Sequence, residues 1–159
     1  MDCSEKLAAS AFEQTESAGF ALTSAEENRV ELIVIEDDQI EAEAISRRLQ
    51  QNHVDVQTHY ATDGGVALGH LLRLAKQKRC DRAILVLDLG MPLIGGIELL
   101  QQIRSAPDLM QATVFVQTGS ADPQLKEVAE QTGVEGYFSK DELPALIAAV
   151  KEHVKENAL

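Results

Sequence analysis

Five short runs with the pattern of a β-strand, each followed by a segment with helical spacing, constrain the fold of this chain most. The strand-like runs lie at 32–35, 54–60, 83–87, 113–117 and 134–138. The segments between these runs carry apolar residues on one helical face. The run at 83–87 is apolar throughout, which indicates a strand buried on both faces of a sheet. Strands that alternate with helices pair in parallel through right-handed crossovers. We therefore expect an α/β fold, a doubly wound three-layer sandwich of five βα units.

The expected helices have recognisable ends. Asp122 before Pro123 predicts an N-cap followed by a proline, whose missing N–H costs nothing in the first helical turn. Gly133 suits the end of the same helix, because glycine adopts positive φ without strain. The other helices are expected at about 39–51, 65–77, 96–105 and from residue 143 onward.

Residues 1–29 differ from the rest of the chain in composition. They are rich in Ala, Ser and Glu and hold six acidic against two basic residues. This N-terminal extension is interpreted as a tail or a short helix, and the sequence leaves that choice open. We assign residues 30–159 to a single domain. Because the chain stops soon after the last expected helix, no second domain is expected.

The charge balance excludes several classes of function. The chain holds 14 basic against 26 acidic residues, a formal net charge of −12. Such a protein repels phosphate backbones, so direct binding of nucleic acid is not expected. No apolar run approaches the roughly 20 residues that span a membrane, and no secretory signal is visible at the N-terminus. Cys3 and Cys80 form no CxxC pair, which favours a reducing, cytoplasmic environment.

Polar residues follow four of the five strands, at the point where each strand ends. They lie at 36–38, at Asp88, at 118–120 and at 139–140. In an open parallel sheet, ligands bind beyond the carboxyl ends of the strands. Because adjacent strands lie about 4.8 Å apart, carboxylates after the first and third strands can converge on one cation. Oxygen ligands of this kind suit Mg²⁺ or Mn²⁺.

Each of these residues also has an ordinary structural explanation. Acidic residues after a strand often cap the next helix, where the helix dipole favours negative charge. A strand-end aspartate is common in turns, and a surface lysine is usually only solvated. The combination at four strand ends nevertheless favours a site. The four histidines lack the spacing of metal ligands, so no zinc site is expected.

The motifs at these positions resemble those of response-regulator receiver domains of the CheY-like superfamily, in particular of the stand-alone type. Residues 32–38 are similar to the first strand of the family with its acidic pair, and 88–99 resemble its DxxMPxxxGxE segment. Residues 114–119 resemble the strand that ends in Thr or Ser, and 133–140 resemble the segment that ends in lysine. The resemblance covers about residues 30–157 and implies the strand order 2-1-3-4-5.

This resemblance implies a role for each site residue. Asp88 would accept a phosphoryl group, and Lys140 would pair with that group as a point charge. Glu36, Asp37 and Asp88, together with the main-chain carbonyl of Gly90, would bind Mg²⁺ or Mn²⁺. The phosphoryl group would come from a histidine kinase or a phosphotransfer protein.

Two further residues would carry the signal. Thr118 would hydrogen-bond the phosphoryl group after a shift of the loop that follows it, and Tyr137 would turn inward when Thr118 moves. The added charge biases one arrangement of this loop through new charge-assisted hydrogen bonds. The implied function is that of a single-domain response regulator of a two-component phosphorelay, acting through protein–protein contacts. The downstream partner is not identified, and a homodimer stays open.

The chain departs from the family pattern at several positions. Asp141 follows Lys140 where many receivers have proline, so we expect a trans bond there, since a cis bond without proline costs about 2.5–4 kcal/mol. Gly90 and Gly119 place no side chain beside the phosphoryl group, and Ser120 follows. These three residues would govern phosphoryl access. We expect an open site, easy access for water and a short phosphoryl lifetime.

Two other functions stay open from the sequence. A phosphorylation-independent interaction module on the same scaffold would not need the complete set of site residues. An Mg²⁺-dependent phosphohydrolase would use Asp88 as nucleophile, but its DxD pattern would require an acid where Gly90 stands. We expect no enzyme activity beyond the protein's own phosphorylation and dephosphorylation. The missing proline and the basic segment 76–79 are also features of receivers that serve phytochrome-type kinases.

Overall fold

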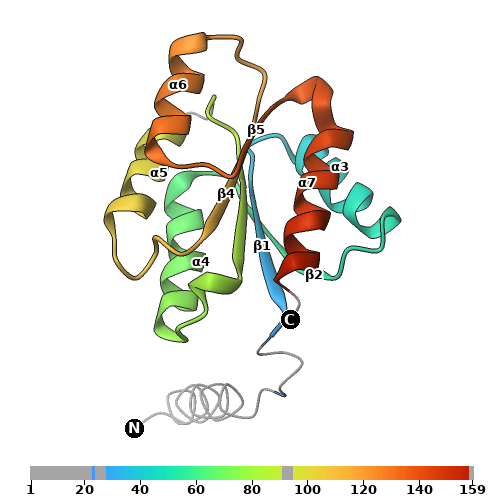
Figure 1. Ribbon diagram of the computed structural model, residues 1–159, viewed down its shortest axis with the longest axis vertical. Helices are drawn as coiled ribbons and strands as arrows, with labels where there is room; N and C mark the ends of the chain where they lie inside the picture. Colours follow the sequence, from blue (N-terminus) through green and yellow to red (C-terminus); the bar gives the residue numbers. More distant parts are fainter. Residues whose placement is uncertain (1–22, 24–27, 91–94, 158–159) are drawn as a thin grey trace, which may run out of the picture.

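The strand-like runs form one parallel sheet in a computed structural model of the chain, which describes residue 23 and residues 28–90 and 95–157 (Figure 1). The order of the strands across the sheet is β2-β1-β3-β4-β5, which confirms the predicted topology. The strands are β1 Val30–Ile35, β2 Val56–Ala61, β3 Ala83–Leu87, β4 Thr113–Thr118 and β5 Gly136–Ser139. β1 and β3 are buried along their whole length, because each has a strand on either side and helices over both faces.

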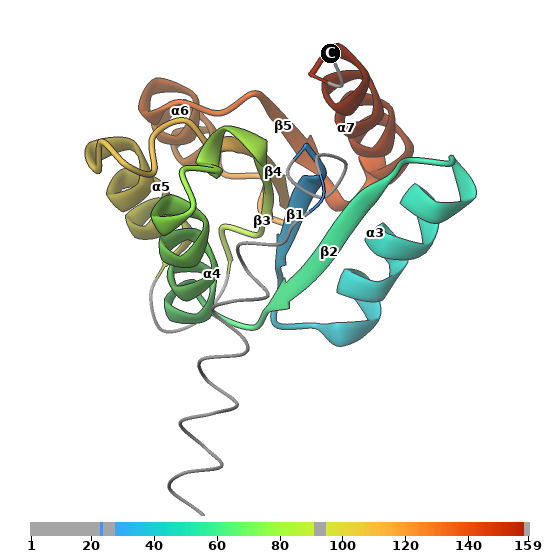
Figure 2. The same ribbon diagram turned by 90° about the horizontal axis from the view of Figure 1, so that it is seen from below.

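Helices cover both faces of the sheet. Figure 2 shows α4, α5 and α6 over one face and α3 and α7 over the other. Their bounds are α3 Gln39–Gln51, α4 Gly64–Lys76, α5 Gly96–Ser105, α6 Pro123–Thr132 and α7 Leu143–Glu156. Two short 3₁₀ helices, η1 Cys80–Arg82 and η2 Lys140–Glu142, precede β3 and α7. Within the described part of the chain, no helix is long and apolar enough to cross a membrane.

The alternation of side chains along the strands builds two cores. Ile33 and Ile35 face the core under α4, α5 and α6, whereas Leu32 and Val34 face the core under α3 and α7. All four side chains are fully buried. Removing this much apolar surface from water fixes the strands in their register. The sheet therefore holds the residues at its carboxyl edge in a fixed arrangement.

Most predicted element bounds agree with the structure to within one residue, but the starts of three strands differ by two residues. β1 begins at Val30, two residues before the predicted run at 32–35. The helices at 39–51 and 96–105 and the strand at 83–87 are confirmed. β2 begins two residues later than predicted, because the N–H of Val54 still donates to the carbonyl of Leu49 at the end of α3. β5 also begins two residues late, although the N–H of Glu135 already bonds Val114.

The predicted helix ends and the backbone after Lys140 are confirmed. The carboxylate of Asp122 caps α6, Pro123 occupies the first turn, and Gly133 ends the helix at a φ of 121°. The described residues contain no cis peptide bond, so Asp141 follows Lys140 through a trans bond. The predicted extension at 1–29 falls, except for three residues, outside the described residues. Residues 91–94 of the motif also lie outside them.

Gly96 is the tightest point between α5 and the end of β3. A Cβ there would lie 2.6 Å from the Cα of Leu89 and 2.9 Å from the carbonyl oxygen of Asp88. Since backbone atoms cannot move aside cheaply, we expect Gly96→Ala to lower the free energy of unfolding by about 1–3 kcal/mol. Urea denaturation measures this change.

Gly69 supplies the matched control. It is exposed on α4, and a Cβ there meets no atom within 4 Å. We expect Gly69→Ala to raise the free energy of unfolding by about 0.4–1 kcal/mol, because alanine restricts the unfolded chain. Equal effects of the two substitutions would contradict the close packing at Gly96.

Candidate functional site

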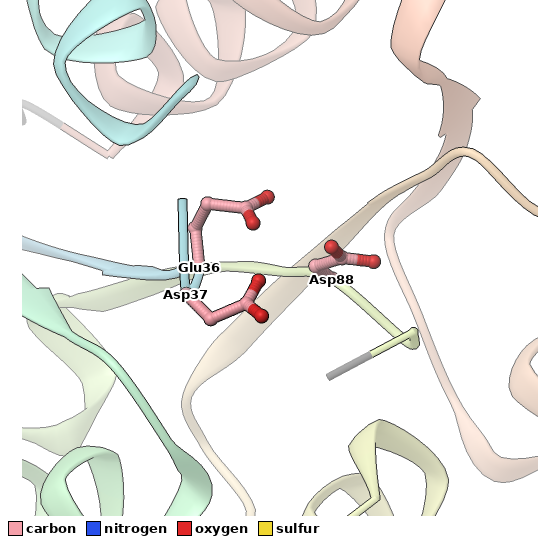
Figure 3. A group of neighbouring side chains, drawn as sticks. All are labelled: Glu36, Asp37 and Asp88. Atoms are coloured by element: carbon pink, nitrogen blue, oxygen red, sulfur yellow. The ribbon is translucent and has the colours of Figure 1, made fainter. Parts of the chain in front are cut away.

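The ends of β1 and β3 bring three carboxylates together. The N–H of Asp88 donates to the carbonyl of Ile35 at 3.1 Å, which continues the pairing of the two strands by one residue. Glu36, Asp37 and Asp88 therefore leave the sheet at the same edge. In Figure 3 the side chains of Glu36 and Asp37 extend towards Asp88. One oxygen from each carboxylate lies within 4.8 Å of the other two.

Asp38, the third acid after β1, has a different role. Its Oδ1 accepts hydrogen bonds from the N–H groups of Ile40 at 2.9 Å and Glu41 at 3.3 Å, so it caps α3. Capping satisfies N–H groups that have no partner inside the helix. Of the three consecutive acids, Asp38 alone is explained by capping, while Glu36 and Asp37 face Asp88.

Lys140 places one positive charge among these carboxylates. It begins η2, directly after β5, and its Nζ hydrogen-bonds the carboxylates of Glu36 and Glu41. The same nitrogen lies 3.6 Å from Oδ2 of Asp88. Burial alone would lower the pKa of Lys140, but the hydrogen bonds that its ammonium donates to Glu36 and Glu41 outweigh burial and raise the pKa. The ammonium therefore stays charged and acts as the counter-charge of the site.

Glu36 is the most buried of the three carboxylates. Burial raises its pKa from 4.5 to about 7, against the opposing effect of its hydrogen bonds with Lys140 and with the N–H of Asp38. A carboxylate taken out of water loses hydration, which favours its neutral form. Near neutral pH, Glu36 is thus poised between its protonated and its charged form.

The donor set of the site fits a hard divalent cation. Glu36 is buried, Asp88 is half-buried and Asp37 is exposed, so oxygen ligands converge while one side stays open to solvent. Mg²⁺ takes oxygen ligands and usually keeps several waters. A cavity of about 190 Å³ adjoins Glu36 and Asp37 and is also lined by Tyr60 and Thr62. Asp88 does not line this cavity, so the fit to a hydrated ion rests on the three carboxylates and on the exposed side of the site.

Two glycines lie against the site. The N–H of Gly90 donates to Oδ1 of Asp88 at 2.9 Å, and a Cβ on Gly90 would lie 3.4 Å from that oxygen. A Cβ on Gly119 would lie 3.8 Å from Cγ of Lys140. Ser120 is exposed, and its hydroxyl accepts a hydrogen bond from the N–H of Asp122. Because Gly90 and Gly119 have no Cβ, neither of these two residues places a side chain beside Asp88 or Lys140.

Thr118 and Tyr137 share a face of the sheet but touch neither Asp88 nor Lys140 through any hydrogen bond of the described residues. Thr118 is buried, and its hydroxyl accepts from the N–H of Ser120 at 3.2 Å. Tyr137 is paired with Val116, two residues before Thr118, so both side chains leave the same face. The hydroxyl of Tyr137 is buried and has no hydrogen-bond partner among the described residues.

The structure adds Glu41, which the sequence analysis did not single out. An acid in the first turn of a helix is ordinarily explained by the helix dipole, and Glu41 fits that explanation. Its place in the first turn of the helix that follows Glu36 and Asp37 was the available signal, because that turn begins at the carboxyl edge of the sheet. Only the fold shows that the side chain of Glu41 meets Lys140.

Comparison with known proteins identifies sequence and fold relatives. The sequence model of the response regulator receiver domain matches residues 32–151. The cell cycle transcriptional regulator CtrA of Caulobacter vibrioides is 29% identical over 131 residues, which cover 80% of this chain and 52% of CtrA. The chain thus spans about half the length of the curated relatives it matches.

Two solved structures share the fold. The Mn(2+)-bound form of response regulator Rcp1 superposes with a TM-score of 0.66 at 22% identity, covering 77% of this chain and 92% of that one. The phosphorylated cyanobacterial phytochrome response regulator RcpA gives a TM-score of 0.64 at 26% identity, covering 79% and 91%.

The raised pKa of Glu36 predicts how stability depends on pH without metal. The folded state binds this proton with a pKa of about 7, against 4.5 as the ordinary value. Between these values the folded state holds the extra proton, so stability falls as pH rises from about 5 to 7, by about 1–3 kcal/mol.

Glu36→Gln removes this titration and should flatten the dependence. Free energies of unfolding measured in EDTA at several pH values give the difference between wild type and variant, which isolates Glu36 from the histidines. An identical slope in both proteins would contradict the assignment.

Proposed function

The chain belongs to the response regulator receiver domain family, and from this premise we propose that it is a two-component switch that accepts a phosphoryl group on Asp88. The observation that carries the proposal is the grouping of Glu36, Asp37 and Asp88 within 4.8 Å, with Lys140 placed 3.6 Å from Asp88. This set offers a nucleophile, metal ligands and a counter-charge at one sheet edge.

The two oxygens of Asp88 are suited to different tasks. Oδ1 accepts the N–H of Gly90, which fixes the carboxylate, while Oδ2 lies towards Lys140. We assign Oδ2 as the atom that attacks phosphorus, forming the Asp88–phosphoryl bond as the bond to the donor histidine breaks. Lys140 then offsets the negative charge that arrives. A Mg²⁺ or Mn²⁺ held by Glu36, Asp37, Asp88 and the Gly90 carbonyl would neutralise charge on the transferring oxygens.

The output of the switch is proposed to pass through Thr118 and Tyr137. Thr118 ends β4 beside the site, and Tyr137 lies on the same sheet face one strand further out. The ring of Tyr137 packs against the core, with Nζ of Lys126 on α6 lying 5.8 Å from its centroid. A hydroxyl that is buried without a hydrogen-bond partner loses its hydration without compensation, which costs free energy. A change at Thr118 can therefore shift Tyr137 and the surface of α6, β5 and α7.

The partners follow from the same proposal. A receiver takes its phosphoryl group from a histidine kinase or a phosphotransfer protein, and we propose that a further protein reads the α6–β5–α7 surface. CtrA is by name a transcriptional regulator, but this chain matches only about half of it. The net charge of this chain, −12, opposes direct contact with nucleic acid. We propose signalling rather than turnover of an external substrate. A phytochrome-type kinase stays a prediction, because receivers of other names match at comparable identity.

Mg²⁺ affinity should depend on Asp37 and not on Asp38. We expect Asp37→Asn to weaken Mg²⁺ binding about tenfold or more, because a direct ligand loses its charge. Asp38→Asn removes the same charge one residue away, and asparagine caps a helix as well as aspartate. We expect less than a threefold effect there, about 0.6 kcal/mol at most. Calorimetric titration compares the two, and equal losses would contradict Asp37 as a ligand.

The phosphorylation test uses intact mass. The full chain incubated with Mg²⁺ and acetyl phosphate should gain one phosphoryl group, and Asp88→Asn should gain none. Asp38→Asn is the matched control and should gain the group as the wild type does. A gain by Asp88→Asn, or wild type that neither gains mass nor binds beryllofluoride, would contradict the proposal. Beryllofluoride binding would still reveal a functional site if the phosphoryl group hydrolysed too fast for its mass to be detected.

The open approach at Gly90 predicts a short phosphoryl lifetime. A side chain there would stand 3.4 Å from Oδ1 of Asp88, close enough to obstruct the attacking water. We expect Gly90→Asn to slow dephosphorylation several-fold, because excluding water from a reactive group prevents its hydrolysis. The decay of the phosphorylated mass after removal of acetyl phosphate measures this rate. Decay as fast as in the wild type would exclude this role of Gly90.

A further inference from the structure

We infer that Glu41 is a positioning residue that competes with the phosphoryl group for Lys140 and so holds the protein in its unphosphorylated state. The inference rests on the proposed function of Asp88. It assigns a regulatory role to a residue of α3 that is neither the phosphoryl acceptor nor one of the two carboxylates grouped with it.

The first step is the position of the Lys140 ammonium. Its hydrogen bonds go to Glu36 and Glu41, and Oδ2 of Asp88 stands 3.6 Å away, beyond hydrogen-bond distance. Glu41 is held in place at the backbone, because its N–H donates to the capping carboxylate of Asp38. The ammonium therefore donates its hydrogen bonds to two other carboxylates and makes only an ion pair with the proposed acceptor.

The second step is a comparison of those two carboxylates. The side chain of Glu36 is 4% exposed and that of Glu41 is 45% exposed. A buried carboxylate without a counter-charge is costly, whereas an exposed one is readily solvated. Glu41 is thus the partner that Lys140 can leave at the lower cost.

The third step is the charge that phosphorylation adds. A phosphoryl group brings about −1.5 to −2 charges and strong acceptor oxygens. Lys140 has three donors in all, and a bond to the phosphoryl oxygens requires a shift from its present position. Every contact that stabilises that present position opposes the phosphorylated state. Without its hydrogen bond to Glu41, Lys140 loses one of the two hydrogen bonds that hold it away from Asp88.

Glu43 offers a matched control on the same helix. It lies two residues after Glu41 and carries the same charge, and its Oε1 accepts from the side-chain amide of Gln39 at 2.8 Å. Glu43 makes no ion pair with Lys140. Glu43→Gln therefore removes one negative charge from α3 and leaves the contacts of Lys140 unchanged.

The test measures beryllofluoride binding to the full chain at saturating Mg²⁺, with fluorine NMR as the readout. We expect Glu41→Gln to bind about three- to tenfold more tightly than wild type, the scale of one partly exposed charge-assisted hydrogen bond. Glu43→Gln should stay within about twofold. The rate of phosphorylation by acetyl phosphate should rise in Glu41→Gln alone.

Glu41→Asp separates the contact from the charge. It keeps the negative charge on a side chain one methylene shorter, so the hydrogen bond to Lys140 is lost, and binding should again tighten. Wild-type affinity in Glu41→Asp, or equal affinities in Glu41→Gln and Glu43→Gln, would overturn the inference and leave the proposed function standing. A wild-type protein that takes neither beryllofluoride nor a phosphoryl group would overturn both.

Discussion

The rest of this structure depends on a balance of charge at one edge of the sheet. Among the described residues, the carboxylates of Glu36, Glu41 and Asp88 lie around the ammonium of Lys140, and Asp37 lies beside Glu36 and Asp88. Like charges this close cannot all persist without compensation, and a buried one raises the cost further. Lys140 lies 104 positions from Glu36 in the chain. Only the parallel order of β1, β3, β4 and β5 carries both groups to the same edge.

Because of this charge balance, the contacts of Lys140 depend on any charge that is added at the site. In the structure, Lys140 compensates Glu36 and Glu41 and stands short of Asp88. Under the proposed function, a bound divalent cation or a phosphoryl group would change the local charge by about two units and so would redirect the ammonium. Gly119 lies against the aliphatic part of the Lys140 side chain and directly follows Thr118. Lys140 is therefore next to the loop that is proposed to move. The buried strands fix the positions of these residues, and the charged side chains lie at the strand ends.

The sequence predicted the architecture and most of the site, because both follow from local patterns. Apolar runs predicted the strands and their parallel sheet, and Asp122, Pro123 and Gly133 predicted the ends of α6. The order of the strands came from the resemblance to receiver domains. The strand-end rule placed Glu36, Asp37, Asp88 and Lys140 at one edge, and the structure brings them together.

The remainder could not be predicted, because it depends on contacts between distant segments. Glu41 meets Lys140 across 99 positions, and its place in a first helical turn already had an adequate local explanation. The later start of β2 depends on the hydrogen bond from Val54 back to α3. The proposed roles of Thr118 and Tyr137 depend on a movement between two conformations of the protein, and the structure shows one of them.

The most direct test of the central claim locates the phosphoryl group by chemistry. The chain is phosphorylated with acetyl phosphate and Mg²⁺, treated with borohydride, which reduces an acyl phosphate to an alcohol, and digested for peptide mass mapping. The account predicts a single modified residue, Asp88, converted to homoserine. Conversion of Glu36 or Asp37, or a phosphoryl group that resists borohydride on a histidine or serine, would contradict it.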